Sequence, residues 1–466
     1  MVLKKDDIVE NITIKDITAD GKSVARHNNQ VIFITQGAPG DVVDIRISAR
    51  RRRFIEGRIV KFHEKSPHRN EAFCEHFGLC GGCKWQHLSY EAQLSYKENH
   101  VMENLKKISG LELPENRPII GSEETSFYRN KLEFTFSNSR WLTTEEINSG
   151  KELSRNGLGF HIPKRFDKVL DINKCWLQKD PSNAIRNYIK TYAEENDLSF
   201  FDLKAQNGLL RNVIIRITST DELMVIVQFF EDQPKQIKEL LTNLKEKFPQ
   251  ITSLLYIING KKNETYYDLP VLQFSGNPYI IEKMGNLKFR IGPKSFYQTN
   301  SRQAHKLYEL VTEMAAFQGS ELVYDLYCGT GTIANFISRK VSKIIGIESV
   351  TEAVEDARIN SEINDIHNTS FFAGDMKDLL SKKFVEQNGK PDVIITDPPR
   401  AGMHQDVVEQ LNKMKPEKLI YVSCNPATQA RDLSLLADHF KIETIQPVDM
   451  FPHTQHVENI TKLTAK

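Results

Sequence analysis

In the last third of the chain, short apolar runs alternate with longer stretches of helical periodicity. Such alternation predicts a mostly parallel β-sheet with helices on both faces. The expected strands cover residues 321–327, 343–349, 369–375, 391–399, 418–424, 440–450 and 456–463. Ligands of these sheets bind beyond the carboxyl ends of the strands. The first candidates for a site are therefore the residues at those ends, Asp325–Tyr327, Glu348, Asp375, Asp397 and Cys424.

The pattern is different toward the N-terminus. Residues 1–66 contain short β-type runs separated by turn-forming stretches, at 8–17, 23–34, 41–48 and 54–65. This spacing predicts a small barrel of the OB type, a fold that often binds oligonucleotides. Residues 67–290 combine a cysteine-rich segment, helical patterns over 89–108 and 233–248, and several strand patterns. We therefore expect an α/β protein with three domains, the barrel (1–66), a mixed α+β central domain (67–290) and a Rossmann-like domain (291–466).

Composition places the chain among ordinary globular proteins, with 466 residues, 39% hydrophobic and 26% charged. No apolar run approaches the roughly 18 residues of a membrane span, and the N-terminal residues show no export signal. We therefore expect a cytoplasmic protein without a membrane partner. The net charge of +1 conceals a basic segment, because residues 1–70 hold 14 Lys and Arg against 9 Asp and Glu. Its run Arg50–Arg53 is either a solvated surface or a contact for nucleic-acid phosphates.

The sequence DLYCGTGTIA, residues 325–334, follows an expected strand and should open a helix. Gly329 and Gly331 would let a ligand approach the backbone closely. The stretch also fits the dinucleotide pattern G-x-G-x-x-A, so a dehydrogenase is one interpretation. The sequence TDPPR, residues 396–400, favours another, because an aspartate and two rigid prolines at a strand end suit a methyltransferase that acts on bases. Either class would use Glu348 to hold ribose hydroxyls.

Three of the six cysteines, Cys74, Cys80 and Cys83, form the pattern C-x5-C-x2-C. In a cytosolic chain such clustering indicates a metal site before it indicates disulfides. Zinc and a [4Fe–4S] cluster both accept four thiolates, and the spacing alone does not choose between them. A fourth ligand is missing nearby, where His76 and His87 are the local alternatives.

Several motifs occur together and in order along the chain, namely CGGCKWQH, SFYQTN, DLYCGTGT, DPPR, SCNP and HVE. In these the chain resembles the RNA (uracil-5-)-methyltransferases, most of all the iron–sulfur members that modify large-subunit ribosomal RNA. The resemblance covers nearly the whole chain. It implies an RNA-binding TRAM domain over residues 1–66, a [4Fe–4S] site in residues 67–290, and a class I methyltransferase domain that binds S-adenosylmethionine over residues 291–466.

The resemblance also implies the residues of the site. Cys424 alone could be a small packing residue, but the family assigns the nucleophile to the cysteine of SCNP and the base to the glutamate of HVE, Glu458. A thiolate that adds to C6 of uracil makes C5 able to take a methyl group, after which a base removes the C5 proton. The implied cofactor-binding residues are Gln298, Tyr327, Glu348, Asp397, Asp375 and Thr332, the last where many members have asparagine. Cys328 is then a structural residue.

By the same resemblance, Cys175 is the distant fourth ligand of a [4Fe–4S] cluster with a structural or RNA-positioning role. The implied substrate is 23S ribosomal RNA, the product 5-methyluridine, and the protein a monomer. Three alternatives remain: the same chemistry on tRNA, a radical enzyme that adds methylthio groups, and a non-catalytic RNA-binding or ribosome-assembly protein. The radical enzymes use the spacing C-x3-C-x2-C, which is absent, and the presence of both Cys424 and Glu458 argues against a non-catalytic protein.

Overall fold

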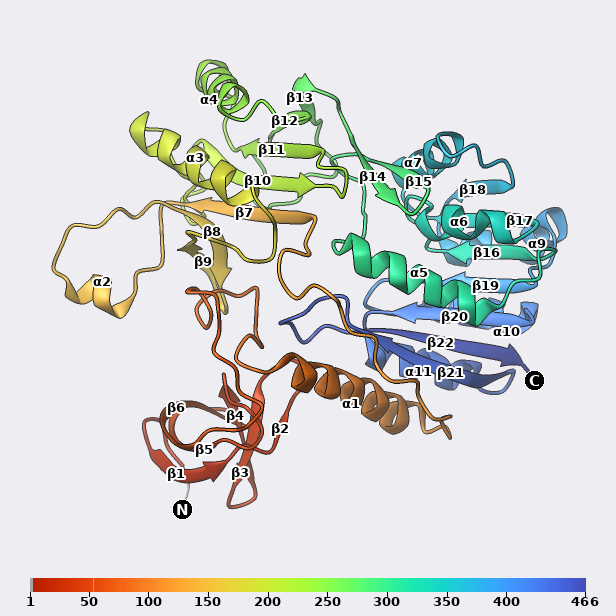
Figure 1. The fold of residues 1–466 in the computed structure, drawn as a ribbon, viewed down its shortest axis with the longest axis horizontal. Coiled ribbons are helices and arrows are strands. Elements are labelled where there is room, and N and C mark those ends of the chain that lie inside the picture. Colours follow the sequence, from red (N-terminus) through yellow and green to blue (C-terminus); the bar gives the residue numbers. More distant parts are fainter. Residues whose placement is uncertain (1–2, 53) are drawn as a thin grey trace.

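The computed structural model of the protein describes residues 3–52 and 54–466. It contains an N-terminal barrel, a central seven-stranded sheet and a C-terminal seven-stranded sheet, with a long helix beside the last (Figure 1). Within these residues, no helix combines the length and hydrophobicity needed to cross a bilayer.

The N-terminal sheet has six strands in the order β1-β5-β6-β4-β3-β2. They are β1 (Ile8–Thr13), β2 (Asp16–Ile17), β3 (Ser23–His27), β4 (Gln30–Thr35), β5 (Val42–Arg50) and β6 (Ile55–Glu64). Alternate isoleucine and valine side chains fill its interior, so the barrel has a core of its own. Arg50 ends β5 and is exposed, as are Arg51 and Arg52, whereas Arg53 lies outside the described residues.

The helix α1 (Tyr90–Ser109) connects the barrel to the C-terminal sheet. Ser89 caps its first turn, and the helix ends at Gly110, whose φ of 68° is a left-handed conformation that glycine adopts readily. Its buried side, which includes Val101, packs against α11 (Pro426–Leu436) in the core of the C-terminal sheet. Residues near the barrel are thereby fixed to the far end of the chain (Figure 1).

The central sheet has the strand order β13-β12-β11-β10-β7-β8-β9. Its strands are β7 (Lys131–Ser137), β8 (Gly157–Ile162), β9 (Arg165–Asp171), β10 (Leu210–Ile217), β11 (Leu223–Phe229), β12 (Ser253–Ile258) and β13 (Leu272–Gly276). The helices α3 (Ser182–Glu195) and α4 (Pro234–Lys247) cover one face, and α2 (Thr144–Asn148) lies in an outlying loop (Figure 1). On β10, Val213 packs beneath the helices, while Ile214 joins the core shared with the C-terminal sheet.

The C-terminal sheet has the order β18-β17-β16-β19-β20-β22-β21. Its strands are β16 (Leu322–Leu326), β17 (Lys343–Glu348), β18 (Thr369–Ala373), β19 (Val393–Thr396), β20 (Lys418–Ser423), β21 (Phe440–Val448) and β22 (Glu458–Ala465). The sheet is mostly parallel, as the alternating pattern predicts, but β22 is antiparallel to both of its neighbours. This reversal brings Glu458, the first residue of β22, to the edge at which the parallel strands end.

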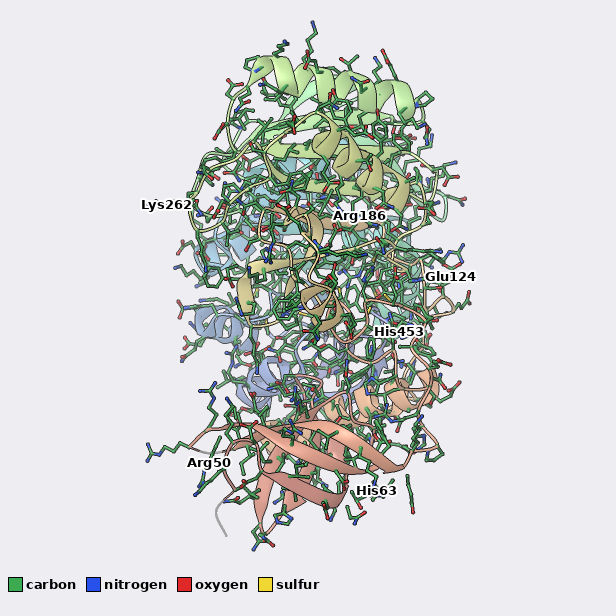
Figure 2. The ribbon with its side chains drawn as sticks, turned by 90° about the vertical axis from the view of Figure 1, so that its left-hand side faces the viewer. Arg50, His63, Glu124, Arg186, Lys262 and His453 are labelled. Atoms are coloured by element: carbon green, nitrogen blue, oxygen red, sulfur yellow. The ribbon has the colours of Figure 1, made fainter. Side chains whose placement is uncertain are left out.

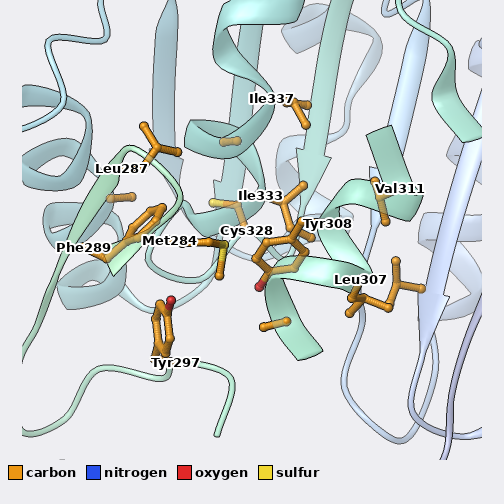
Figure 3. Packing of buried hydrophobic residues seen from close by; sticks show 14 of the residues in the cluster. Met284, Leu287, Phe289, Tyr297, Leu307, Tyr308, Val311, Cys328, Ile333 and Ile337 are labelled. Carbon is orange, nitrogen blue, oxygen red and sulfur yellow. The ribbon is translucent and has the colours of Figure 1, made fainter. Parts of the chain in front are cut away.

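Helices cover both faces of this sheet, and a two-stranded hairpin lies beside it. Besides α11, these elements are β14 (Ile280–Met284), β15 (Leu287–Ile291), α5 (Ser301–Ala315), α6 (Thr332–Ile337), the 3-10 helix η1 (Ser338–Lys340), α7 (Thr351–Glu362), α8 (Met376–Leu379), α9 (Lys382–Asn388) and α10 (Gln405–Met414). Cys328 is buried in the core that they form, among Met284, Tyr308 and Ile333 (Figure 3). This apolar environment is what a structural role for Cys328 requires.

A buried ion pair joins α1 to the segment that precedes β22. Lys97 Nζ donates to Asp449 Oδ1 at 2.6 Å, and neither side chain is accessible to solvent. The other carboxylate oxygen accepts from the Tyr90 hydroxyl at 2.9 Å, and Lys97 also donates to the carbonyl of Phe451 at 3.0 Å. Because a buried charge is tolerated only with such partners, the pair fixes this segment against the helix.

Replacement of Lys97 by methionine should lower the free energy of unfolding by about 3–5 kcal/mol, because the Asp449 carboxylate is left buried without its cation. The double variant Lys97→Met, Asp449→Leu should recover much of this loss, since apolar side chains avoid the cost of burying two charges. Urea denaturation of the three proteins measures both differences. A single variant as stable as the unaltered protein would show that the pair does not hold the segment.

Candidate active site

Two side chains singled out in the sequence meet at the edge of the C-terminal sheet. Ser423 of β20 pairs with Asn459 of β22, so the adjoining residues Cys424 and Glu458 lie side by side. Glu458 is buried, and Cys424 is half-buried. A thiol and a carboxyl group in this arrangement can serve as a nucleophile and a proton acceptor for one reacting group.

The Cys424 thiol lies among opposing charges. Burial raises its pKa to about 11, and the negative charge of Glu458 contributes to the rise. The positive charge of the nearby Arg400 guanidinium acts in the opposite direction. Asn425 Nδ2 and the Thr428 hydroxyl donate to the Arg400 carbonyl at 3.0 and 3.1 Å, which holds this loop against α11. A cation beside the sulfur favours the thiolate.

Sequence reasoning did not single out Arg400, although it closes the TDPPR motif. Its role depends on the loop after β19 folding back onto the start of α11, which spacing along the chain does not reveal. The signal in the sequence that could have identified Arg400 is its place in the TDPPR motif.

A second carboxyl group lies at the same edge. Asp397 follows β19, and its backbone N–H donates to the Leu326 carbonyl of the neighbouring β16 at 3.4 Å. Burial raises the pKa of Asp397 to about 7. Burial also raises the pKa of Glu458 well above its ordinary value, and the nearby charge of Asp397 raises it further. Such carboxyl groups can accept a proton near neutral pH.

The glycine loop between β16 and α6 borders open space. A Cβ atom at Gly329 would meet no atom within 4 Å, whereas one at Gly331 would lie 2.9 Å from Ala357 and 3.0 Å from Phe371. Gly329 therefore leaves room for a ligand, and Gly331 allows close packing against α7. Tyr327 begins this loop with a φ of 62°, which is uncommon for a residue other than glycine.

Two polar side chains join the glycine loop from neighbouring elements. Glu348, at the end of β17, accepts from the Gly329 N–H at 3.1 Å and from the Val350 N–H at 2.9 Å. Thr332 opens α6, and its hydroxyl lies 3.2 Å from that of Tyr308. The carboxylate of Glu348 is thus held beside the open space at Gly329.

Asp325 carries the buried carboxyl group of β16, and only one of its two oxygen atoms accepts a hydrogen bond within the described residues. Its Oδ2 accepts from the Ala334 N–H at 3.0 Å, but its buried Oδ1 has no partner among the described residues. Burial raises the pKa of Asp325 to about 8. This oxygen, next to the glycine loop, could accept a hydrogen bond from a donor group of a bound ligand.

The remaining two candidates lie at the margins of this region. Gln298 belongs to a loop that Asn130 holds by donating to the Gln298 carbonyl at 2.8 Å. The Thr330 hydroxyl donates to the Phe296 carbonyl at 3.4 Å and ties this loop to the glycine loop. Asp375 follows β18, is exposed, and caps α8. The structure therefore places Gln298 near the glycine loop and Asp375 at the outer end of the sheet edge.

Comparison with known proteins identifies the family. The sequence profile described as tRNA (Uracil-5-)-methyltransferase matches residues 217–466, and the TRAM domain profile matches residues 9–60. A protein of Bacteroides thetaiotaomicron described as an uncharacterized RNA methyltransferase is 56% identical over 451 residues, which cover 96% of this chain and 99% of that protein. The chain belongs to the tRNA (uracil-5-)-methyltransferase family.

Other matches agree with this assignment. A protein of Chlorobaculum tepidum, also described as an uncharacterized RNA methyltransferase, is 40% identical over 98% of this chain and 96% of its own length. The crystal structure of the Pyrococcus abyssi tRNA (uracil-54, C5)-methyltransferase in complex with S-adenosyl-L-homocysteine matches with a TM-score of 0.75 and 29% identity, covering 97% of this chain and 99% of that one. The protein is therefore an enzyme, a methyltransferase with an N-terminal TRAM domain, which removes the dehydrogenase, radical-enzyme and non-catalytic interpretations.

The methyltransferase brings its four expected cluster cysteines together. Cys74, Cys80, Cys83 and Cys175 are free thiols. Burial raises the pKa of Cys80 to about 11 and that of Cys83 to about 12, and the other thiols of the group raise both further. Cys175, distant in sequence, is therefore near the other three. Among the described residues, however, no group of three or more His, Cys, Asp or Glu side chains could hold a metal ion.

The two histidines that were local alternatives have other partners. His76 Nε2 accepts from the Asn173 N–H at 3.0 Å, and His87 Nε2 lies 2.9 Å from the Gly37 carbonyl. Burial lowers the pKa of both rings. These contacts leave Cys175 as the better candidate for a fourth ligand.

The electrostatic coupling at Cys424 can be tested with two opposite substitutions. Glu458→Gln removes a charge that raises the thiol pKa, so the pKa should fall below about 11, while Arg400→Gln removes a charge that lowers it, so the pKa should rise. Below the pKa, each unit of fall raises the thiolate fraction about ten-fold. The pH dependence of iodoacetamide alkylation, measured by mass spectrometry of the Cys424 peptide, reports the pKa. If both substitutions shifted the Cys424 pKa in the same direction, Glu458 and Arg400 would not have opposite effects on the thiol.

Proposed function

We propose that this methyltransferase uses S-adenosylmethionine to methylate C5 of a uridine in 23S ribosomal RNA, through a covalent bond between Cys424 and C6, giving 5-methyluridine. The observation that carries the proposal is the position of Cys424 beside Glu458 at the edge where the parallel strands end. We further propose that the enzyme acts in the cytoplasm as a monomer.

The residues around Gly329 fit S-adenosylmethionine. The cofactor carries a ribose, an adenine and an amino-acid group, and the region offers the Glu348 carboxylate, an unpartnered Asp325 oxygen and a glycine without a neighbour. The proposed holding residues are Gln298, Tyr327, Thr332, Glu348, Asp375 and Asp397. The P. abyssi enzyme, which contains S-adenosyl-L-homocysteine, supports this cofactor. When bound, S-adenosylmethionine supplies an electrophilic methyl group.

In the proposed mechanism, the Cys424 sulfur bonds to C6 of uracil, and the electron pair of the C5–C6 double bond becomes available at C5. Arg400 favours the thiolate that makes this attack. After C5 has received the methyl group, the Glu458 carboxylate accepts the C5 proton. The electron pair of that C–H bond re-forms the double bond, and the sulfur leaves. The raised pKa of Glu458 suits a proton acceptor, because a stronger base takes a proton more readily.

The RNA substrate has a second candidate. The P. abyssi neighbour is a tRNA (uracil-54, C5)-methyltransferase, and this favours tRNA. The four converging cysteines favour ribosomal RNA, through the iron–sulfur members that the sequence resembles. Mapping 5-methyluridine in ribosomal RNA and tRNA from cells with and without the gene distinguishes the two, since only the true substrate loses the modified base.

Variants of the proposed nucleophile and of the proposed base should lose activity in different ways. Cys424→Ala should reduce turnover by at least a thousand-fold with little change in S-adenosylmethionine binding, because no covalent step can begin. Glu458→Gln should instead accumulate a protein–RNA adduct that survives a denaturing gel, because the C5 proton is not removed. The measurements are methyl transfer to unmodified RNA, calorimetric cofactor binding and gel mobility. Turnover by Cys424→Ala, or no adduct with Glu458→Gln, would move these roles to other residues.

We also propose that Cys74, Cys80, Cys83 and Cys175 hold a [4Fe–4S] cluster with a structural or RNA-positioning role. Four free thiols, three of them half-buried and one buried, that disfavour one another's ionisation are typical of a site that binds metal as thiolates. Each cysteine of a cluster binds its own iron atom, so the sulfurs lie farther apart than around a single zinc ion.

Purified without oxygen, the protein should contain about four iron atoms per chain and be brown. Cys175→Ser should lose most of the iron, whereas Cys424→Ala, a cysteine variant outside the group, should retain it. Metal analysis and the visible absorption spectrum measure both. Stoichiometric zinc, or full iron content in Cys175→Ser, would contradict the proposed ligands.

A further inference from the structure

A group of aromatic side chains lies on the surface, outside the proposed catalytic and cofactor-binding residues. Phe73 and Phe127 are 42% and 36% exposed, and Trp176 is half-buried. The ring centroids of Phe73 and Phe127 lie 5.7 and 5.5 Å from that of Trp176. These three rings are here named the aromatic platform, and the Phe73 ring lies beside that of His453, which Figure 2 labels. Adjacent exposed rings indicate a binding surface, because water solvates them poorly.

The fold holds the aromatic platform in place. The Phe127 N–H donates to the Trp176 carbonyl at 2.7 Å, and the Arg129 N–H donates to the Leu177 carbonyl at 2.7 Å. Phe127 has a φ of 55°, a left-handed conformation that is unfavourable for a bulky side chain. An exposed ring kept on a strained backbone suggests that its position serves a function.

Positive charge accompanies the rings. Lys174 Nζ lies 3.6 Å from the ring centroid of Trp176 and 5.9 Å from that of Phe127. The Arg129 guanidinium lies 5.3 Å from the ring centroid of Phe451. Over residues 3–52 and 54–466, no carboxylate forms a salt bridge with Lys174 or Arg129. Exposed rings with unpaired cations suit single-stranded nucleic acid, whose bases stack on aromatic side chains and whose phosphates attract lysine and arginine.

The platform adjoins the segment that leads to the proposed catalytic residues. The Phe73 ring lies 5.2 Å from the ring of His453, in the segment that leads to β22. Three residues later, His456 has its pKa lowered to about 4 by burial and then by cations that include Arg400 and Arg129. Arg400 is also the cation that lowers the pKa of the nucleophilic thiol. A chain of neighbouring groups therefore connects the platform with the sulfur.

We propose that the aromatic platform stacks an unpaired base of the substrate RNA, with Lys174 binding a neighbouring phosphate. This rests on the proposed RNA methylation. A uridine that leaves its stack to reach Cys424 leaves neighbouring bases without partners. Stacking of such a base on Phe73 and Phe127 offsets part of that cost.

Binding of a fluorescent twelve-nucleotide oligouridine, without cofactor, tests the platform. Phe127→Asn removes the ring and tolerates the positive φ, so it should weaken binding roughly ten-fold. The salt dependence should stay the same, because no phosphate contact is lost. Lys174→Met should flatten the slope of log affinity against log salt by about one, because one phosphate contact is lost.

Phe166→Ala is the matched control, since Phe166 is 70% exposed on β9 and lies outside the platform. It should bind oligouridine like the unaltered protein. Iron content and the urea midpoint should be unchanged in all three variants, which separates loss of stacking from damage to the fold. Unaltered binding by Phe127→Asn would overturn the proposal in favour of a protein contact, and an unaltered salt slope for Lys174→Met would overturn the phosphate contact.

Methyl transfer to unmodified ribosomal RNA and tRNA by the same variants separates this inference from the proposed function. If Phe127→Asn weakens oligouridine binding but the unaltered protein methylates neither RNA, the platform stands and the proposed function fails. If the unaltered protein methylates RNA and oligouridine binding does not depend on Phe127, the proposed function stands and the platform is wrong.

Discussion

The buried ion pair between Lys97 and Asp449 links the parts of the molecule on which the site depends. Lys97 lies on α1, which follows the barrel and the cysteine segment, whereas Asp449 lies in the connection from β21 to β22. Two charges withdrawn from water are stable only when their partners are in place, so the pair permits one arrangement of the connection. Glu458 begins the strand after this connection. Its position beside Cys424 therefore depends on an ion pair whose two residues are 352 positions apart in the chain.

Burial also decides the chemistry at the sheet edge. It raises the pKa of Cys424, Asp397 and Glu458, in each case toward the neutral form. Because burial favours the neutral form of all three groups, the thiol would be a poor nucleophile without a cation nearby. The Arg400 guanidinium is that cation. Because the raised carboxyl groups are stable when protonated, they can hold a proton during the reaction without a second cation. The site thus combines one thiol, whose ionisation Arg400 favours against the effect of burial, with neighbouring proton acceptors.

Much of the C-terminal fold follows from its hydrophobic pattern, since each expected apolar run overlaps an observed strand, as with Lys418–Ser423 inside 418–424. The direction of β22 cannot be predicted from this pattern, because parallel and antiparallel strands can have the same apolar sequence pattern. Glu458 therefore entered the candidate site through family resemblance, not through strand-end reasoning. Arg400 and the Lys97–Asp449 pair were missed for a related reason. Both depend on contacts between segments that the pattern treats as independent.

The contacts of His453 explain why a reaction without electron transfer would benefit from a metal cluster. The backbone N–H groups of Lys84 and Trp85, which follow the C-x5-C-x2-C segment, both donate to the His453 carbonyl at 2.8 and 3.0 Å. The His453 N–H donates to Gln93 Oε1 on α1 at 2.8 Å. The cysteine segment, the long helix and the approach to Glu458 thus meet at one residue. A cluster bound by the proposed cysteines would fix that meeting point, and so would keep both the aromatic platform and the proton acceptor in position without taking part in the chemistry.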